Sequence, residues 1–139
     1  RASQVWSGIG ANVVTMTHEE HDAAFAAVSH LPHLLAFAYT NALIGQPQGD
    51  RFLSLAGPGF RDFSRIAASD PVMWRDVLLA NREQVLQQSQ AFRKALEDLE
   101  ALMTAGDLQG LEQSIAAASK ARAAWKPNSS TDALAQQDS

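Results

Sequence analysis

Apolar residues recur at helical spacing along most of the chain, beginning with a long segment between Thr17 and Ile44. Thr17 and Glu20 have the spacing of a capping box, in which the threonine accepts a hydrogen bond from the third helical amide and the glutamate reaches back. The Ala-rich segment that follows continues to about Ile44, where glycine and proline end it. Pro32 lies inside this predicted helix. We expect a kink there, because proline loses a backbone hydrogen bond and clashes with the carbonyl group of Val28.

A second long helix is predicted over residues 70–105. Asp70 is a favourable N-cap, and Pro71 suits the first helical position. Apolar residues recur along this helix at every seventh position, as in helices packed against partner helices: Leu78, Val85, Phe92 and Leu99. At the standard rise such a helix would be about 50 Å long. The core of so small a chain does not need this length, so we expect the stripe to contact a second subunit.

Shorter helices are predicted from the same kind of pattern over residues 51–55, 60–67 and 108–125. A Gly-Pro-Gly loop at residues 57–59 separates the first two, and Pro127 ends the third. The polar, Gln-rich residues 127–139 are predicted to form a disordered tail.

The first 17 residues follow a different pattern. Residues 2–9 are consistent with the last turns of a helix, and residues 13–16 with a short β-strand. A lone strand cannot satisfy its own edges, so we expect its partner strands to lie elsewhere in a longer protein. The predicted fold is mainly α: a helical domain over residues 18–126, preceded at residues 1–17 by the remnant of an α/β unit.

The composition limits the cellular compartment and the classes of binding partner that we expect for this protein. The chain has 139 residues, 46% hydrophobic and 19% charged, as in one globular domain. Acidic residues outnumber basic ones by 15 to 11, so nucleic acid is not expected as a partner, because phosphate binding needs a basic surface. No apolar run approaches the roughly 20 residues of a membrane span. The absence of cysteine suits a cytoplasmic protein, and the absence of a first methionine suggests a fragment.

All four histidines fall within the first predicted helix. His30 and His33 are three positions apart, so they share one helix face around Pro32. A zinc site would need a third ligand, and no helical zinc signature is present, so no metal is predicted. From spacing alone, hydrogen-bonded imidazoles inside a helix bundle are the favoured interpretation of this pair. His18 and His21, near the helix start, are predicted to face solvent.

A second group of candidate residues follows the Gly-Pro-Gly loop. Asp62 and Arg65 are three positions apart, which is consistent with a surface ion pair. The residues around them are largely apolar, and an arginine oriented by an aspartate in such surroundings would also suit a carboxylate or phosphate ligand. Trp74, just after the predicted helix start, is interpreted as a core residue or a pocket wall.

Three segments together resemble the C-terminal domain of bacterial prephenate dehydrogenases, a family that includes arogenate and cyclohexadienyl dehydrogenases. They are Val28–His33, Gly59–Pro71 and Met73–Asp76. The resemblance extends over residues 10–125. Residues 10–14 are similar to the last strand of the family's Rossmann-type, dinucleotide-binding domain, and the resemblance therefore assigns residues 1–17 to that domain.

This resemblance implies an enzyme of tyrosine biosynthesis that oxidatively decarboxylates prephenate to 4-hydroxyphenylpyruvate with NAD or NADP. The family's cofactor loop and catalytic histidine belong to the N-terminal domain, so no catalytic or cofactor-binding residue is assigned here. The resemblance makes Arg65 and His33 contacts of the substrate, supported by His30 and Asp62. It also places Trp74 near the pocket of the neighbouring subunit, in a homodimer formed by this helical domain.

The sequence departs from the family pattern at one position, and alternative functions are open. Pro58 stands where relatives often have glycine, which affects the expected contact between the loop backbone and the ligand. A helical interaction or regulatory module without a pocket is the alternative function, and a fusion to another enzyme of the aromatic pathway is a third interpretation. The sequence does not distinguish NAD from NADP, or prephenate from arogenate.

Overall fold

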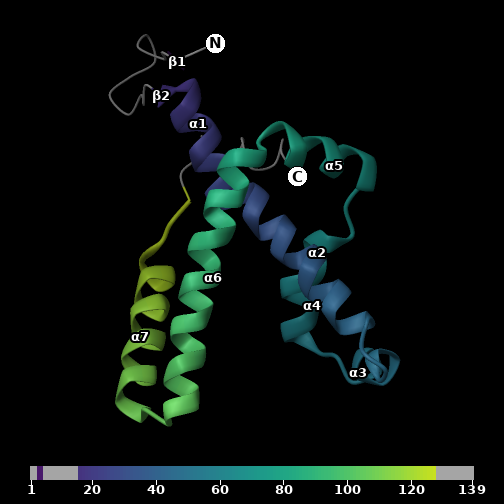
Figure 1. The fold of residues 1–139 in the computed structure, drawn as a ribbon, viewed down its shortest axis with the longest axis vertical. Helices are drawn as coiled ribbons and strands as arrows, with labels where there is room; N and C mark the ends of the chain where they lie inside the picture. Colours follow the sequence, from purple (N-terminus) through teal and green to yellow (C-terminus); the bar gives the residue numbers. More distant parts are fainter. Residues whose placement is uncertain (1–2, 5–15, 128–139) are drawn as a thin grey trace. The chain divides into compact units, whose positions relative to one another are not determined.

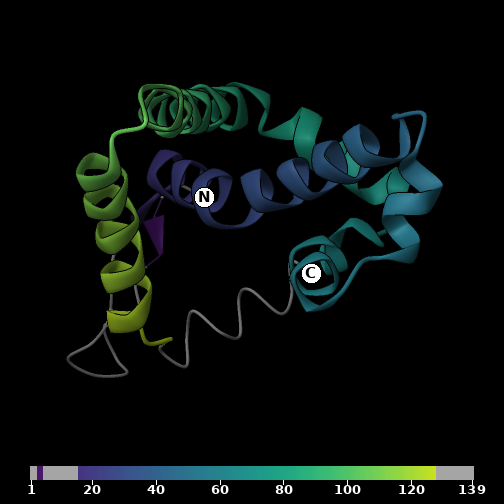
Figure 2. The ribbon, with the colours of Figure 1, turned by 90° about the horizontal axis from the view of Figure 1, so that it is seen from below.

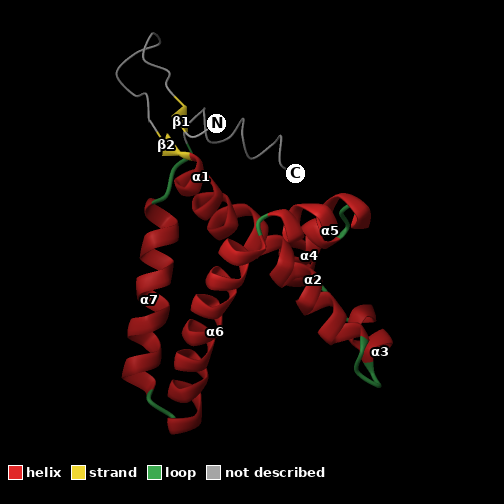
Figure 3. Cartoon of the chain, turned by 45° about the horizontal axis from the view of Figure 1, so that its top comes forward, coloured by secondary structure: helices red, strands yellow, loops and turns green. Residues whose placement is uncertain are grey.

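The computed structural model describes residues 3–4 and 16–127, and the chain divides into two compact units, residues 1–88 and 89–139. Most of the described residues are helical, with two very short strands and connecting loops (Figures 1 and 3), which confirms the mainly α fold. The elements are β1 (Ser3–Gln4), β2 (Met16–Thr17), α1 (His18–Phe25), the π-helical turn η1 (Ala26–His30), α2 (Leu31–Ile44), α3 (Gly49–Ser54), α4 (Pro58–Ser64), the 3-10 turn η2 (Arg65–Ala67), α5 (Pro71–Ala80), α6 (Arg82–Ala105) and α7 (Leu108–Ala124).

The two short strands correct the prediction for the N-terminus. β1 and β2 pair antiparallel, with Ser3 opposite Thr17 and Gln4 opposite Met16. The helix expected over residues 2–9 is therefore wrong at Ser3–Gln4, and β2 finds its partner within this chain. Of the strand expected at residues 13–16, only Met16 is described. Residues 13–15, and the predicted tail from residue 128 onward, lie outside the described residues.

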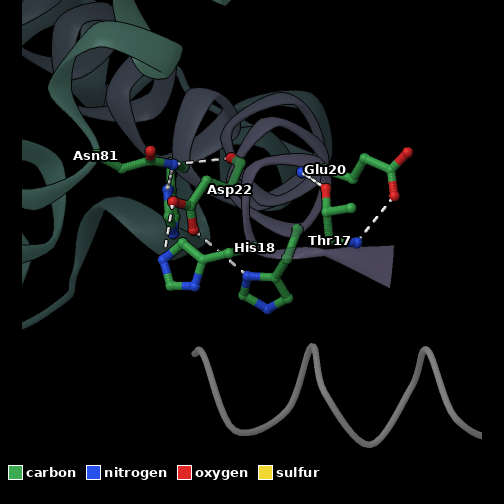
Figure 4. Close-up of polar contacts among 7 residues, drawn as sticks. Thr17, His18, Glu20, Asp22 and Asn81 are labelled. Carbon is green, nitrogen blue, oxygen red and sulfur yellow. Dashed lines mark hydrogen bonds and ion pairs between the residues drawn. The ribbon is translucent and has the colours of Figure 1, made fainter. Parts of the chain in front are cut away.

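The start of α1 is the predicted capping box. The Thr17 hydroxyl accepts from the amide of Glu20 at 3.0 Å, and the Glu20 carboxylate accepts from the amide of Thr17 at 2.9 Å (Figure 4). Two backbone donors that the helix leaves unpaired are thereby satisfied.

The irregularity expected at Pro32 takes the form of a π-helical turn, η1, directly before α2. Within it the amide of Leu31 donates to the carbonyl of Ala26, five residues back rather than four. This wider turn accommodates the proline ring, which would clash with a carbonyl four residues earlier in a regular α-helix. α1 and α2 nevertheless follow one another across the first unit (Figure 2).

Two helices replace the single one predicted over residues 70–105. The start is correct, because the Asp70 carboxylate accepts from the amide of Met73 at 2.7 Å. α5 then ends at Ala80, and Asn81 leaves helical geometry with φ −115° and ψ 33°. α6, with 24 residues, is about 36 Å long instead of the 50 Å expected.

The first unit has a small core within its described residues. Its buried members come from η1, α2, α5 and α6: Ala26, His33, Ala36, Trp74 and Val85. Because Val85 is buried and Leu78 is half-buried, the upstream part of the predicted seven-residue stripe is used inside this unit. α3, α4 and η2 pack against α2. α4 begins at Pro58, so the predicted loop is partly helical.

The second unit contains α6 from residue 89 onward and α7, which a tight turn at residues 106–107 connects (Figures 1 and 3). Gly106, with φ 66°, ends α6 in the left-handed conformation. Its amide donates to Met103 at 3.1 Å, and the amide of Asp107 donates to Leu102 at 3.0 Å. These bonds satisfy the last carbonyls of α6 and reverse the chain. None of the helices in the described part of the chain is long and apolar enough to cross a membrane.

Candidate functional site

The most distinctive arrangement of side chains in the first unit surrounds Trp74. The imidazole of His33 stacks on the indole, with ring centroids 3.7 Å apart and 15° between the planes. Phe37 and His30 meet the indole edge to face, at 6.4 Å and 5.9 Å. His33 is 4% exposed and Trp74 1% exposed. We call these four residues the Trp74 cluster.

The backbone determines which nitrogen of His33 carries a proton. Nδ1 of His33 lies 2.9 Å from the carbonyl oxygen of Ser29, one helical turn back. A carbonyl only accepts, so Nδ1 donates, and the lone pair of the neutral ring is on Nε2. The hydrogen bond at Nδ1 therefore fixes the orientation of the His33 ring and leaves the lone pair on Nε2 as an acceptor.

Trp74 contributes a buried donor. Its indole Nε1–H has no hydrogen-bond acceptor among the residues that the structure describes. Leaving such a group unpaired costs about 1–3 kcal/mol, and an unsatisfied donor of this kind in a native core calls for a specific explanation. An oxygen acceptor on a ligand at this position would remove the cost.

A residue that was not predicted from the sequence, Asn81, contacts His30. The side-chain amide of Asn81 donates to the backbone carbonyl of Asp22 at 2.8 Å (Figure 4). The same nitrogen lies 3.3 Å from Nδ1 of His30. The only sequence signal for Asn81 was a short polar residue, of low helix propensity, inside a predicted helix.

Arg65 and Asp62 are not brought together as predicted. Asp62 pairs with its neighbour Arg61 at 3.7 Å, and both side chains are more than 70% exposed. Arg65 is also exposed and forms no ion pair within residues 16–127. The physical reason is the change from α4 to the tighter η2 between them, which alters the three-residue spacing on which the prediction relied.

The structure thus separates the predicted site residues into two sets. His30, His33 and Trp74 belong to one cluster, whereas Asp62 is exposed on α4 and Arg65 is exposed on η2, which packs on α2. His18 and His21 have side chains 56% and 43% exposed, as predicted for the helix start. Across the described ranges, no three His, Asp or Glu side chains gather as a metal-binding group.

The described residues thus form a mainly helical domain, with a buried His–Trp stack in its first unit. A family model described as "Prephenate dehydrogenase, dimerization domain" matches residues 17–117. The chain belongs to this family of prephenate dehydrogenase dimerization domains.

Individual relatives agree with this family. The prephenate dehydrogenase of Lactococcus lactis subsp. cremoris is 33% identical over 128 residues, which cover 88% of this chain and 35% of the relative. A prephenate dehydrogenase structure from A. aeolicus, in complex with hydroxyphenyl propionate and NAD+, has a TM-score of 0.71 and 41% identity over 77% of this chain and 38% of that one. The arogenate dehydrogenase structure from Synechocystis has a TM-score of 0.72 and 29% identity over 76% of this chain and 39% of that one. The chain therefore spans somewhat more than a third of the length of these relatives.

Proposed function

We propose that this chain is the substrate-binding and dimerization part of a prephenate dehydrogenase. The enzyme would oxidatively decarboxylate prephenate, or the related arogenate, with NAD or NADP. The family match and the named relatives support this proposal. The cytoplasmic location expected from the sequence stays a prediction.

We place the cofactor site outside this chain. The Gly-Pro-Gly segment at residues 57–59 lacks the spacing of a phosphate-binding loop, and its residues begin the short helix α4. A separate dinucleotide-binding domain would supply the nicotinamide that accepts the hydride. The domain limits predicted from the sequence, with residues 1–17 belonging to that domain, stay part of the proposal.

In the proposed reaction, the main task of this chain would be to position the substrate. Loss of the ring carboxylate of prephenate as CO₂ makes the ring aromatic, so the protein has to orient a dianion and assist removal of the hydroxyl proton. Groups that hold carboxylate and keto oxygens are needed for orientation, and positive charge has to be available in a domain with an overall negative charge.

The buried indole N–H of Trp74 carries the proposal. It is a donor without an acceptor, and it lies against His33, whose Nε2 accepts when neutral and donates when protonated. The pair can therefore bind an oxygen of the substrate from two directions. An unpaired donor at a buried aromatic residue calls for an explanation, and the proposal supplies one in an oxygen of the substrate.

Arg65 is proposed as the anion anchor. Its guanidinium is exposed and has no carboxylate partner among the described residues, so it is available to form two parallel hydrogen bonds with a substrate carboxylate. Because Asp62 pairs with Arg61 instead, the proposal gives Asp62 no direct hold on Arg65. Asp62 stays in it as a residue of the adjoining helix α4.

Arg65→Ala, made in the complete enzyme, tests this function. The Michaelis constant for prephenate should rise roughly ten- to a hundred-fold, as expected for the loss of a charge-assisted bond worth about 1.5–3 kcal/mol. Arg65→Lys should recover only part of the loss, because an ammonium group cannot make the paired contact. Arg93→Ala, an exposed arginine of the second unit, is the matched control. An Arg65→Ala enzyme that folds and keeps the wild-type Michaelis constant would contradict the proposal.

We also propose that the working form is a homodimer. The family model that matches this chain is that of a dimerization domain. In agreement with it, α6 and α7 leave large apolar side chains exposed, among them Leu96, Met103, Leu108 and Ile115.

A further inference from the structure

Asn81 links three distant parts of the first unit. It is the single residue between α5 and α6, and its own backbone is not helical. Its side-chain nitrogen reaches the carbonyl of Asp22 in α1 at 2.8 Å and Nδ1 of His30 in η1 at 3.3 Å. These partners precede it by 59 and 51 residues, respectively.

The contact with Asp22 fixes which way the amide of Asn81 faces. A backbone carbonyl only accepts, so the atom of Asn81 beside it has to be the nitrogen and not the oxygen. The same nitrogen therefore meets His30. Because an amide NH₂ group has two hydrogens and no acceptor capacity, it can donate to both partners at once.

The nitrogen of His30 that faces Asn81 consequently has to accept. We propose that Asn81 is a positioning residue that holds His30 in the neutral tautomer with its proton on Nε2. A proton on Nδ1 of His30 would set one N–H group against another.

This arrangement makes His30 and His33 opposite tautomers. His33 donates from Nδ1 to the carbonyl of Ser29 and so has its lone pair on Nε2, whereas His30 accepts at Nδ1 and has its proton on Nε2. Both rings pack against Trp74, one on its face and one at its edge. The cluster thus combines donors at Trp74 and His30 with an acceptor at His33.

The consequence for binding rests on the proposed function. A ligand that carries both oxygen acceptors and a hydroxyl donor, as a cyclic hydroxy acid does, matches this mixture of groups. With both histidines protonated on Nδ1, Trp74 would be the one donor among these three side chains. Asn81 would therefore determine how well such a ligand is held, without touching it.

The tautomers can be measured directly in the 139-residue chain by ¹⁵N NMR after labelling of histidine. His30→Gln and His33→Gln assign the signals. The expected pattern is a protonated Nε2 and an unprotonated Nδ1 for His30, with the reverse for His33. A His30 ring with its proton on Nδ1, or with both tautomers equally populated, would overturn the inference without any variant at Asn81.

Two substitutions give shifts of different size if Asn81 is responsible. Asn81→Asp replaces the donor by an acceptor, so His30 should become protonated at Nδ1. Asn81→Ala removes the donor that faces Nδ1, so the fraction of His30 protonated at Nε2 should fall. The signals of His33 should stay in place in both variants, because its partner is Ser29. Asn41→Ala, at an exposed asparagine of α2, should leave all four histidines unchanged.

Kinetics of the complete enzyme test the proposed substrate site separately from the role of Asn81 toward His30. If Asn81→Ala changes the His30 tautomer and also raises the Michaelis constant several-fold with kcat retained, both are supported. A changed tautomer with an unchanged Michaelis constant would contradict the proposed site. An unchanged tautomer in both variants would overturn the role of Asn81, whatever the activity.

Discussion

The imidazole of His33 and the indole of Trp74 are stacked at 3.7 Å, and together they are both the core of the first unit and its candidate binding site. The stacked face excludes water, while Nε1 of Trp74 is left without an acceptor in the described structure. Burial of this kind strengthens any hydrogen bond that a ligand makes here, because the local dielectric is low. The same burial makes the empty donor costly, so binding and stability should respond differently to substitution.

Trp74→Phe is predicted to separate these two effects. Phenylalanine keeps an aromatic ring against His33 but removes the indole N–H. In the complete enzyme we expect the Michaelis constant for prephenate to rise about tenfold, as for one lost hydrogen bond to a charged group. The lost volume should lower the free energy of unfolding by about 1–3 kcal/mol, and removal of the unpaired N–H should offset part of this loss.

Phe37→Leu provides the control for Trp74→Phe. It removes aromatic volume beside the same indole, where the ring centroids are 6.4 Å apart, but no polar atom. Denaturant unfolding should show a comparable loss of stability, and steady-state kinetics should show an unchanged Michaelis constant. Equal kinetic effects from the two variants would mean that the indole N–H makes no bond to the substrate.

Local rules predicted where helices begin, and long-range contacts decided where they break. The capping box at Thr17 and the N-cap at Asp70 depend only on residues within one turn, and both are confirmed. The break at Asn81 depends on partners more than fifty positions earlier in the chain, which no local pattern contains. A continuous helix through Asn81 was therefore the natural but incorrect prediction.

The candidate site shows the same division. The three-residue spacing of His30 and His33 correctly placed both on the face that meets Trp74. The same spacing failed for Asp62 and Arg65, because the helix tightens between them and Asp62 has a nearer partner in Arg61. The roles of these residues toward a substrate came from family resemblance and stay predictions.

Two glycines are predicted to respond to alanine with opposite signs. Gly106 has φ 66°, and an added Cβ would meet nothing within 4 Å, so the cost of Gly106→Ala is that of the left-handed backbone alone. We expect a loss of about 1–2 kcal/mol in the free energy of unfolding. Gly59 lies inside α4, also with open space around it, and Gly59→Ala should gain about 0.5–1 kcal/mol. Denaturant unfolding of both variants checks this pair, and a stabilised Gly106→Ala would contradict it.

Lys94 is predicted to titrate above an ordinary lysine. Its hydrogen bond and charge interaction with Asp98, at 2.6 Å, raise the pKa of Lys94 above the usual 10.5. A raised pKa in the folded state means that the pair stabilises the protein below pH 10.5, and that this stabilisation is lost as the pH rises through the folded-state pKa. Because Lys94 is fully exposed, the contribution is small and should fall with added salt. NMR titration of Asp98→Asn should show the pKa of Lys94 lowered, and an unchanged value would mean that the pair does not form in solution.

Leu96→Glu is predicted to dissociate the homodimer. Four apolar residues on α6 recur at spacings of four, three and four, so they form one stripe: Phe92, Leu96, Leu99 and Met103. Leu96 is 43% and Met103 67% exposed in the single chain, which leaves much of this stripe for a partner to cover. A two-fold interface contains each substitution twice, and each copy would lose roughly 1.5–3 kcal/mol of apolar burial in addition to the cost of an unpaired charge. The dissociation constant of the dimer should therefore rise at least a hundred-fold.

Ala101→Glu, at an exposed position about 140° around the same helix, is the matched control and should leave the dimer intact. Sedimentation equilibrium at micromolar concentration, with circular dichroism to confirm helix content, measures both variants. A wild-type monomer, or a Leu96→Glu dimer as tight as wild type, would show that this stripe is not the interface.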